Sequence, residues 1–432
     1  MAQLFYTDDS LMKLHFVGIG GIGTSGLAQL CAHLGHEISG SNLGSNLIFE
    51  TLQKEGFTNL YDRHNAHNLK SDTNLLIYSE AVPTDNPERE RAQELGIPEK
   101  SYFEYLGEIS KNYQTIAVAG THGKTTTTGL IAAGLSNTDF DATILVGSTL
   151  DILEGKNFKA GSNKFLVAEA CEYRDNFKFL NPEVLIITNL EWDHADFYKS
   201  EEAYFEAFKQ LAQKSKNVMY HQNDEAVRTL LEDVNTNKLP IPAQSPNSWE
   251  AILNIWGEAN QQNATLALAL GHFLKLNTDK FKSGLGFYKG AGRRQEFLGQ
   301  HKGLEVYDDY GHHPTEIKAT LQAFRSRFPH KKIGLIYEPH QYSRTHKFFA
   351  EFADSFKLAD QTALFPIYEA RDTAEDKAAV SLQNFVSDNP KLHLVSSIIE
   401  AQNFATQLDK GDLLLFMGAG KISEFAKEFI KT

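Results

Sequence analysis

The chain has 432 residues, of which 41% are hydrophobic and 22% charged, with a formal net charge of −13. At ~150 residues per domain, this length predicts two or three domains, each with its own core. The negative charge argues against a nucleic-acid partner, which would need a basic face. With only two cysteines there is no disulfide framework, and no apolar run approaches the ~20 residues that span a bilayer. Residues 1–10 lack the basic and apolar regions of a signal peptide, so we expect a soluble cytoplasmic protein.

The first predicted strand, residues 14–18, runs into the turn Gly18-Ile19-Gly20-Gly21-Ile22-Gly23. A helix to about residue 34 and a strand over 36–40 complete the opening βαβ unit of a nucleotide-binding domain. A dinucleotide site would place an acidic residue at the end of the second strand, where this chain has Ser39-Gly40-Ser41-Asn42. Two interpretations stay open: a nucleotide site, or a tight turn without a ligand.

The remainder of the first block continues the α/β pattern. Residues 74–79, ending in Ser79, predict another short strand, and residues 86–95 have helical patterning. Residues 108–114 are polar, and we interpret them as a linker into a second domain.

The second block opens with the most informative motif of the chain. An apolar predicted strand, residues 115–119, is followed by Gly120-Thr121-His122-Gly123-Lys124-Thr125-Thr126 and by a helix from about Thr126. In such a loop backbone N–H groups face a phosphate, Lys124 neutralises charge and Thr125 offers a hydroxyl to Mg²⁺. Val118 replaces the first glycine of the full Walker spacing, so this is a shortened variant. We expect an ATP site; the alternative is a glycine-containing turn with a surface lysine.

Two acidic clusters follow predicted strands of the same domain. Residues 165–168 run into Glu169-Ala170-Cys171-Glu172, and residues 184–188 run into a segment that ends in Asp193-His194. Open α/β sheets bind ligands at the carboxyl ends of their strands. We therefore expect Glu169 and His194 to contribute to a Mg²⁺ site beside the phosphate loop. Taken singly, each could be a solvated strand end or a loop histidine.

The region after the second cluster is less informative. Residues 201–214 predict an amphipathic helix, and residues 222–248 are polar, contain three prolines and predict a loop-rich stretch. Residues 260–264 then open an apolar helix to about residue 274. Its asparagines, Asn263 among them, either cap this helix or contact a base.

A third α/β block starts near Gly290 and contains Arg293-Arg294. The run 307–316 includes Asp309 and His312, and a helix starts near Pro314. A strand over 333–337 precedes the run 338–345, and a strand over 413–417 ends in Gly418-Ala419-Gly420-Lys421. Alternating strands and helices predict another small α/β domain with loops that face anions.

Together these motifs resemble those of the Mur ligases, the ATP-dependent amide-forming enzymes of peptidoglycan precursor synthesis. The resemblance covers nearly the whole chain, through residues 18–21, 120–126, 169–172, 188–194 and 309–314. It implies three α/β domains: a Rossmann-like UDP-sugar domain over 1–111, a P-loop ATPase-like domain over 112–289, and a Rossmann-like closing domain over 290–432.

The resemblance also implies a reaction. ATP phosphorylates the substrate carboxylate to an acyl phosphate, and the amine of the incoming amino acid displaces phosphate. Within the family, the runs 308–316 and 339–345 favour the members that join L-alanine to UDP-N-acetylmuramate. Residues 189–196 also resemble murein tripeptide ligases, which stay an alternative. Two other functional classes stay open. A nicotinamide dehydrogenase would use the turn at residues 18–23 but would leave Lys124 without a role. A non-catalytic nucleotide sensor would bind ATP without turnover.

Residue roles follow from the resemblance, motif by motif. Lys124 holds the β- and γ-phosphates, Thr125 and Glu169 hold one Mg²⁺ and His194 serves a second. Asn263 contacts adenine, Arg294 reaches the γ-phosphate, and Asp309 reaches the nucleotide from the closing domain. The remaining ATP contacts are expected at Gly120, Thr121, His122, Gly123 and Thr126. UDP-sugar contacts are expected at Gly18, Ile19, Gly20, Gly21, Ile22, Ser39, Asn42 and Ser79, and amino-acid contacts at His312, His340, Tyr342 and Arg344.

This chain departs from the family pattern at two positions and in the stretch from Lys214 to Asn260, which is shorter than in the family. Asn42 stands where the family usually has Asp, and Ala259 stands where it has His. These changes bear on the expected UDP and adenine contacts. Some Mur ligases also carry a carbamylated lysine in the place of Lys209, which could equally be an ordinary solvated lysine.

Overall fold

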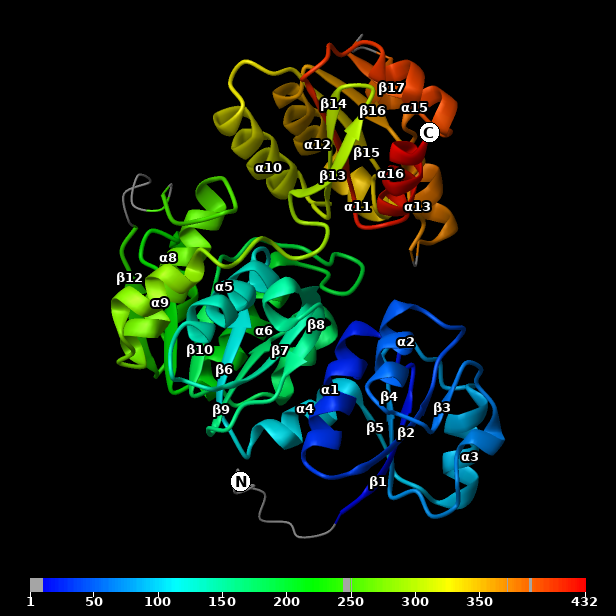
Figure 1. Ribbon diagram of the computed structural model, residues 1–432, viewed down its shortest axis with the longest axis vertical. Coiled ribbons are helices and arrows are strands. Elements are labelled where there is room, and N and C mark those ends of the chain that lie inside the picture. Colours follow the sequence, from blue (N-terminus) through cyan, green and yellow to red (C-terminus); the bar gives the residue numbers. More distant parts are fainter. Residues whose placement is uncertain (1–10, 244–248, 250, 371, 388–390) are drawn as a thin grey trace. The chain divides into compact units, whose positions relative to one another are not determined.

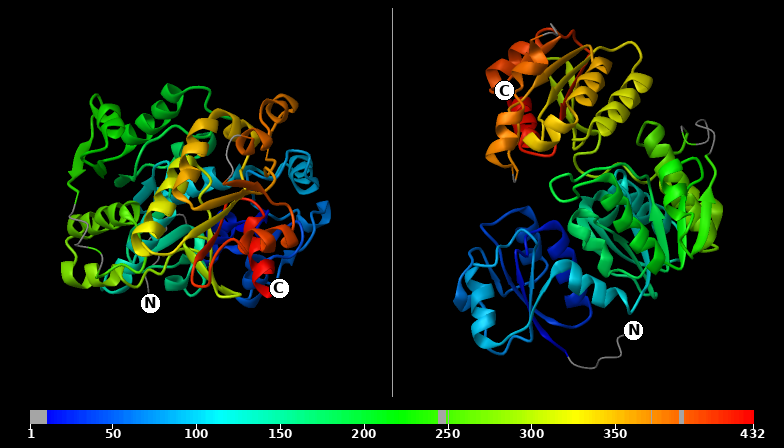
Figure 2. Two further views of the ribbon diagram at one scale, coloured as in Figure 1. Left: turned by 90° about the horizontal axis from the view of Figure 1, so that it is seen from above. Right: turned by 180° about the vertical axis from the view of Figure 1, so that it is seen from behind.

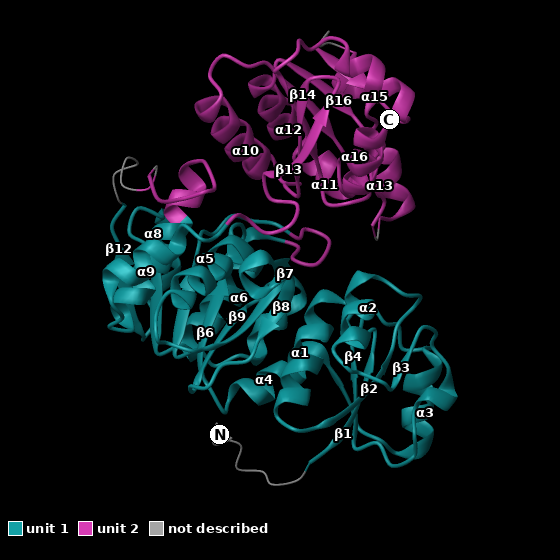
Figure 3. Cartoon of the chain, viewed as in Figure 1, with its two compact units in different colours: residues 1–193, 200–244, 263–288 teal, residues 194–199, 245–262, 289–432 magenta. Residues whose placement is uncertain are grey.

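The computed structural model describes residues 11–243, 249, 251–370, 372–387 and 391–432. The chain divides into two compact units (Figure 3). Unit 1 comprises residues 1–193, 200–244 and 263–288, and unit 2 comprises residues 194–199, 245–262 and 289–432. Within the described part, no helix is long and apolar enough to cross a membrane. The expectation for residues 1–10 falls outside that part.

The first sheet of unit 1 is parallel and, among the described residues, has the strand order β3-β2-β1-β4-β5 (Figure 1). Its strands are β1 (Lys13–Val17), β2 (Glu37–Ser41), β3 (Leu60–Tyr61), β4 (Leu75–Tyr78) and β5 (Glu99–Ser101). Its helices are α1 (Ile22–His33), α2 (Leu47–Lys54), α3 (Pro87–Leu95) and α4 (Tyr102–Ser110). The order reverses direction around β1, so the glycine-rich turn after β1 lies at the switch point where such sheets bind ligands.

The second sheet of unit 1 has the order β12-β11-β10-β6-β9-β7-β8 in the described chain, with only the β7–β8 pair antiparallel. Its strands are β6 (Gln114–Ala119), β7 (Thr143–Leu150), β8 (Lys156–Lys159), β9 (Phe165–Glu169), β10 (Val184–Ile187), β11 (Asn217–His221) and β12 (Asn237–Ile241). The helices are α5 (Lys124–Ser136), α6 (Glu201–Lys214), α7 (Glu225–Leu231), α8 (Glu258–Phe273) and α9 (Thr278–Leu285). Strands β6, β9 and β10 are adjacent, so the phosphate loop and both acidic clusters leave one edge of the sheet.

The sheet of unit 2 has the order β13-β14-β18-β15-β16-β17 over the residues described, and β13 alone is antiparallel. Its strands are β13 (Glu296–His301), β14 (Leu304–Asp309), β15 (Ile333–Tyr337), β16 (Gln361–Leu364), β17 (Leu392–Leu394) and β18 (Leu413–Met417). The helices are α10 (Pro314–Arg327), α11 (Tyr342–Lys347), α12 (Phe349–Ser355), α13 (Ala374–Ala379), α14 (Gln383–Val386), α15 (Ile398–Ala405) and α16 (Ile422–Lys431).

Both faces of this sheet are covered by helices (Figure 2). Successive residues of β18 alternate between two buried clusters: Leu415 packs with Phe324 of α10, and Phe416 packs with Phe429 of α16. Burial on both faces explains why the strand reads as a continuous apolar run. The predicted class, three α/β domains, is confirmed.

Two predictions about connecting segments were wrong. Residues 108–110 belong to α4, which a Ser101–Glu104 capping box starts, so the predicted linker shrinks to residues 111–113. The predicted loop over 222–248 contains α7 and β12, although residues 244–248 lie outside the described chain. Strand β12 tolerates Pro240 because it is the edge strand and pairs only with β11.

Candidate functional site

The phosphate loop of unit 1 contains two glycines with a positive φ and little space for a side chain. Gly120 has φ 130°, and a Cβ there would lie 2.0 Å from the Thr188 hydroxyl of the neighbouring strand end. Gly123, the N-cap of α5, has φ 84°, and a Cβ there would lie 2.7 Å from Oδ1 of Asn263. Gly123 contributes no side chain to cap α5, which is the arrangement of an anion-binding helix start.

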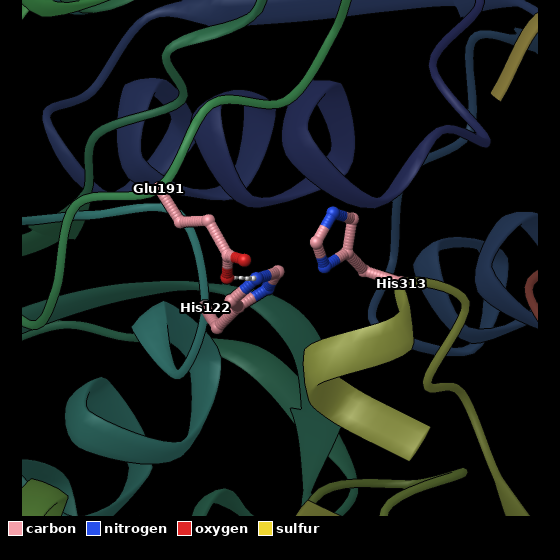
Figure 4. Close-up of side chains that lie close together, drawn as sticks. All are labelled: His122, Glu191 and His313. Carbon is pink, nitrogen blue, oxygen red and sulfur yellow. Dashed lines mark hydrogen bonds and ion pairs between the residues drawn. The ribbon is translucent and has the colours of Figure 1, made fainter. Parts of the chain in front are cut away.

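The end of β10 holds this loop from one side. The Thr188 hydroxyl and the Asn189 amide donate to the His122 carbonyl at 2.6 and 2.8 Å, and the His122 N–H donates to Asn189 Oδ1 at 2.9 Å. The buried Thr121 hydroxyl donates to the Glu191 carbonyl at 2.7 Å. The His122 imidazole faces the Glu191 carboxylate, with 3.2 Å between Nε2 and Oε2 (Figure 4). Thr121 and His122 therefore help to fix the loop.

Lys124 is held beside a buried carboxylate. Its ammonium donates to the carbonyls of Gly120 and Thr121 at 2.6 and 3.0 Å and lies 2.9 Å from Glu172 Oε2. Burial acts to lower the pKa of Lys124, but the charge and hydrogen bond of Glu172, together with the charges of ionised Cys171 and Glu169, outweigh it and raise that pKa above its ordinary value. Burial also raises the pKa of the nearby Cys171 thiol to about 12. The surroundings of the phosphate loop thus combine a fixed cation, Lys124, with a neutral thiol, Cys171.

Thr125 and Glu169 are brought together as expected. The Thr125 hydroxyl donates to Glu169 Oε2 at 3.1 Å, and Oε1 of the same carboxylate accepts from the Gly147 N–H at 2.7 Å. One hydroxyl and one anchored carboxylate at the mouth of a phosphate loop are oxygen donors of the kind that Mg²⁺ prefers. The donor set therefore fits this cation.

The two remaining residues expected near the nucleotide differ in placement. Asn263 lies inside α8, which begins at Glu258, so it does not cap this helix, and its amide lies against the phosphate loop at Gly123. His194 begins the segment 194–199, which groups with unit 2, and has a left-handed backbone with φ 55°. Lys209 is half-buried on α6.

The glycine-rich turn after β1 is fastened to the end of β2. The N–H groups of Gly18 and Ile19 donate to the Ser41 carbonyl at 2.8 and 2.9 Å. The Gly20 N–H donates to Asn42 Oδ1 at 3.2 Å, and the Asn42 amide donates to the Gly44 carbonyl at 2.8 Å. Asn42, the departure from the family pattern, thus holds the turn with an uncharged side chain.

One cavity of about 330 Å³ joins the two glycine-rich loops within unit 1. It is lined by Gly21, Ile22 and Ser79 from the first domain, and by Lys124, Gly147, Glu169 and Cys171 from the second. Asn157 on β8, also in its wall, donates to the Ile22 carbonyl and to the Ser25 hydroxyl at the start of α1. The predicted sugar-nucleotide turn and the predicted ATP loop therefore open into the same space. Ser39, in contrast, bonds through its hydroxyl to His15 Nδ1 at 2.8 Å.

Unit 2 brings Arg294 and Asp309 to the carboxyl end of β14. The buried Asp309 carboxylate accepts from the N–H groups of Gly311 at 2.8 Å and Gln295 at 3.0 Å. Burial raises the pKa of Asp309 to about 6, against the opposing charge of Arg294. The Arg294 guanidinium lies over the Tyr310 ring and 3.4 Å from Glu316 Oε1.

The residues expected to contact the amino acid gather only in part. The rings of His312 and His340 are 5.9 Å apart, and the buried Arg344 donates to His340 Nδ1 at 3.4 Å. His340 also stacks on Tyr368 at 5.3 Å, a contact that the sequence did not indicate. Tyr342 packs against the apolar core on one face of the sheet.

Sequence reasoning named no role for four residues that the structure places at the site. Glu172 and Asn189 fix Lys124 and the loop, and they could have been found because both follow predicted strands. Asn157 comes from an antiparallel hairpin, and the half-buried Tyr102, whose ring lies against Gly23, comes from a helix absent from the prediction. Nothing in the sequence marks these two as neighbours of the cavity.

Three family models match consecutive parts of the chain. They are described as "Mur ligase family, catalytic domain" over residues 13–114, "Mur ligase middle domain" over residues 118–242, and "Mur ligase, glutamate ligase domain" over residues 293–420.

Full-length relatives carry one activity in their names. The chain is 36% identical to a UDP-N-acetylmuramate–L-alanine ligase of Acetivibrio thermocellus, covering 100% of this chain and 98% of the relative. It is 35% identical to the enzyme of the same name from Clostridium perfringens, covering 97% and 98%. The solved UDP-N-acetylmuramate–alanine ligase of Thermotoga maritima matches with a TM-score of 0.79 and 28% identity over 97% of this chain and 98% of that one. A murein peptide ligase of Psychrobacter arcticus shares the fold, with a TM-score of 0.70 and 21% identity over 97% and 98%.

Proposed function

Because the chain belongs to the Mur ligase family, we propose that it joins L-alanine to the carboxylate of UDP-N-acetylmuramate at the expense of ATP. Relatives of that name match over its full length. The single observation that carries the proposal is the shared cavity, because the reaction must bring a sugar-nucleotide carboxylate to a nucleotide phosphate.

The first step transfers a phosphoryl group between two anions, the γ-phosphate and the substrate carboxylate. Such a step needs positioning, positive charge and exclusion of water rather than covalent catalysis. Lys124, with its raised pKa, supplies a cation in the cavity wall at every physiological pH. The amine of L-alanine then attacks the acyl phosphate, and phosphate leaves.

Mg²⁺ is part of the proposal. Thr125 and Glu169 would hold it, since their oxygens are already adjacent and Gly147 fixes the carboxylate. When bound, the cation would neutralise charge between the phosphate and carboxylate groups. We assign His194 to a second cation and Asn263 to the adenine on the family motif, with Asn263 further supported by its contact with the loop.

Unit 2 would complete the site. We assign Arg294 to the γ-phosphate and Asp309 to the nucleotide. His312, His340 and Arg344 form a polar group at the ends of β14 and β15 that suits the carboxylate and amine of an amino acid. Tyr342 would contribute from the start of α11. The boundaries near residues 111 and 289, and a cytoplasmic location that matches two free cysteines, belong to the same proposal.

The proposal is tested by phosphate release from ATP with UDP-N-acetylmuramate and a panel of acceptors. L-Alanine should support turnover with the highest kcat/KM, ahead of glycine, L-serine and the murein tripeptide. A preference for the tripeptide would indicate a recycling ligase instead. Nucleotide binding without phosphate release for any acceptor would indicate a non-catalytic sensor.

A further inference from the structure

The first domain contains a buried carboxylate that no part of the proposed reaction uses. Glu88, in the first turn of α3, has a fully buried side chain. Its Oε2 accepts from His15 Nε2 at 3.1 Å and from the Ser41 hydroxyl, and its Oε1 accepts from the Asn65 N–H at 3.0 Å and the Asn68 amide at 2.7 Å. Burial by itself raises the pKa of Glu88, but these donors outweigh it and lower the pKa below its ordinary value.

Such a group is costly unless every acceptor position is filled. A buried carboxylate needs a partner for each lone pair, and Glu88 obtains them from three separate segments: β1, the end of β2 and residues 64–68. A glutamine in place of Glu88 would direct its N–H₂ group toward the hydrogen-bond donors that face one of the two carboxylate oxygens. The charge itself is therefore what holds these segments together.

One of the segments carries the predicted sugar-nucleotide turn. The Ser41 hydroxyl donates to Glu88, and the Ser41 carbonyl receives the N–H groups of Gly18 and Ile19. His64 Nδ1 lies 2.9 Å from the same Ser41 hydroxyl. The position of the glycine-rich turn is thus linked to Glu88 through a single residue.

Another segment lines a separate hollow of the same domain. Asn65 and Asn68, both bonded to Oε1 of Glu88, line a depression of about 640 Å³ together with Tyr61, Asp62 and Arg63. These residues follow β3, beside the end of β2, at the edge of the sheet where α/β folds bind nucleotides. Glu88 therefore joins two stretches of backbone at this edge of the sheet, the end of β2 and residues 65–68.

We propose that Glu88 is a positioning residue for the uridine-diphosphate sugar: its ionised carboxylate fixes the glycine-rich turn and residues 62–68 relative to each other and so sets the affinity for that substrate. This inference rests on the proposed function for the identity of the ligand, and on the hydrogen bonds alone for the coupling between the two segments. Glu88 contacts no reacting atom.

The kinetic test compares Glu88→Gln with Glu90→Gln, which removes the same charge from an exposed position of the same helix. In Glu88→Gln, we expect the KM for UDP-N-acetylmuramate to rise about tenfold or more, because buried donors lose their acceptor. The KM for ATP and the kcat at saturating sugar nucleotide should stay within threefold of the parent, and Glu90→Gln should match the parent. Equal KM values for UDP-N-acetylmuramate in both variants, or a parallel loss of kcat and of ATP affinity in Glu88→Gln, would overturn the proposal.

A second measurement needs no turnover. Amide hydrogen exchange of the ligand-free protein should be faster over residues 62–68 and 18–21 in Glu88→Gln, and unchanged over the phosphate loop. Calorimetry with UDP alone should show a matching loss of affinity. If the parent binds UDP but does not ligate L-alanine, the proposed function is wrong, and the exchange and calorimetry measurements still test the role of Glu88. Unchanged exchange over 62–68 would refute that role whatever the activity.

Discussion

Replacing Lys124 by methionine should separate the catalytic role of its charge from its structural role. The ammonium has neighbours of two kinds: the loop carbonyls of Gly120 and Thr121, and the Glu172 carboxylate, of which only 3% of the side chain is exposed. Methionine keeps the length of the stem and removes the charge. The substitution therefore removes a cation from the reaction and leaves a buried carboxylate without its cation.

Two magnitudes follow. Loss of one charge-stabilising contact to a transferring group typically costs a factor of about 10² to 10³ in kcat. Breaking a buried ion pair from one side costs about 3 to 5 kcal/mol of stability, and we expect the lower end because 17% of the Lys124 side chain remains exposed. Binding of UDP-N-acetylmuramate should change little, because its expected contacts before residue 111 are intact.

The double variant Lys124→Met with Glu172→Gln decides between the two effects. Neutralising both partners should restore most of the lost stability, measured by urea unfolding, and should not restore phosphate release. Turnover of Lys124→Met within tenfold of the parent would refute the assignment of this loop to ATP. If adding Glu172→Gln to Lys124→Met does not restore stability, the Lys124–Glu172 ion pair is not the way in which Lys124 stabilises the fold.

Three further predictions concern the loop, the closing domain and a buried acid. Gly120→Ala should destabilise the protein by more than about 2 kcal/mol, because its Cβ would meet Thr188, whereas Gly155→Ala, with φ 76° and open space, should cost about 1 kcal/mol in unfolding experiments. Bound ATP analogue plus UDP-N-acetylmuramate should reduce the radius of gyration in small-angle scattering, since Arg294 and Asp309 must reach a nucleotide held by unit 1; no change at saturation would contradict their assignment. Burial raises the folded-state pKa of Asp309 to about 6, above its ordinary value of 3.8, so its contribution to stability is present at low pH and is lost as pH rises from about 4 to beyond 6. Relative to Asp309→Asn, the parent should lose about 2.4 kcal/mol between pH 4 and pH 7, and a pH-independent difference would refute the raised pKa.

Prediction from the sequence was most accurate for strands that are buried on both faces of a sheet. Strands such as 333–337 and 413–417 were predicted at their observed bounds because a parallel strand covered by helices is apolar throughout. The edge strands β8 and β12 were missed because they lack such an apolar run. They lie at the ends of the second sheet and carry lysine, asparagine and proline. Helix α4 was missed because its last residues are polar and its signal is a capping box rather than a long amphipathic pattern.

The candidate site divides in the same way. Lys124, Thr125 and Glu169 were predictable because strand ends of a parallel sheet converge, and the structure places them together. Three other features depend on contacts between side chains from distant segments. They are the ion pair of Lys124 with Glu172, the hydrogen bond from Asn157 to α1, and the burial of Glu88. The local sequence pattern does not predict contacts between distant segments, so these contacts are seen only in the structure.

The most direct test of the account follows one oxygen atom. UDP-N-acetylmuramate labelled with ¹⁸O in its carboxylate is incubated with ATP and L-alanine, and the released phosphate is analysed by mass spectrometry. Forming an acyl phosphate requires a carboxylate oxygen to attack the γ-phosphorus and expel ADP, and this oxygen leaves with phosphate when the amine attacks the carbonyl carbon. Each amide formed should therefore be accompanied by one ADP and by one phosphate that carries one ¹⁸O. Amide formation with unlabelled phosphate, or with AMP and pyrophosphate as products, would contradict phosphoryl transfer to the substrate carboxylate.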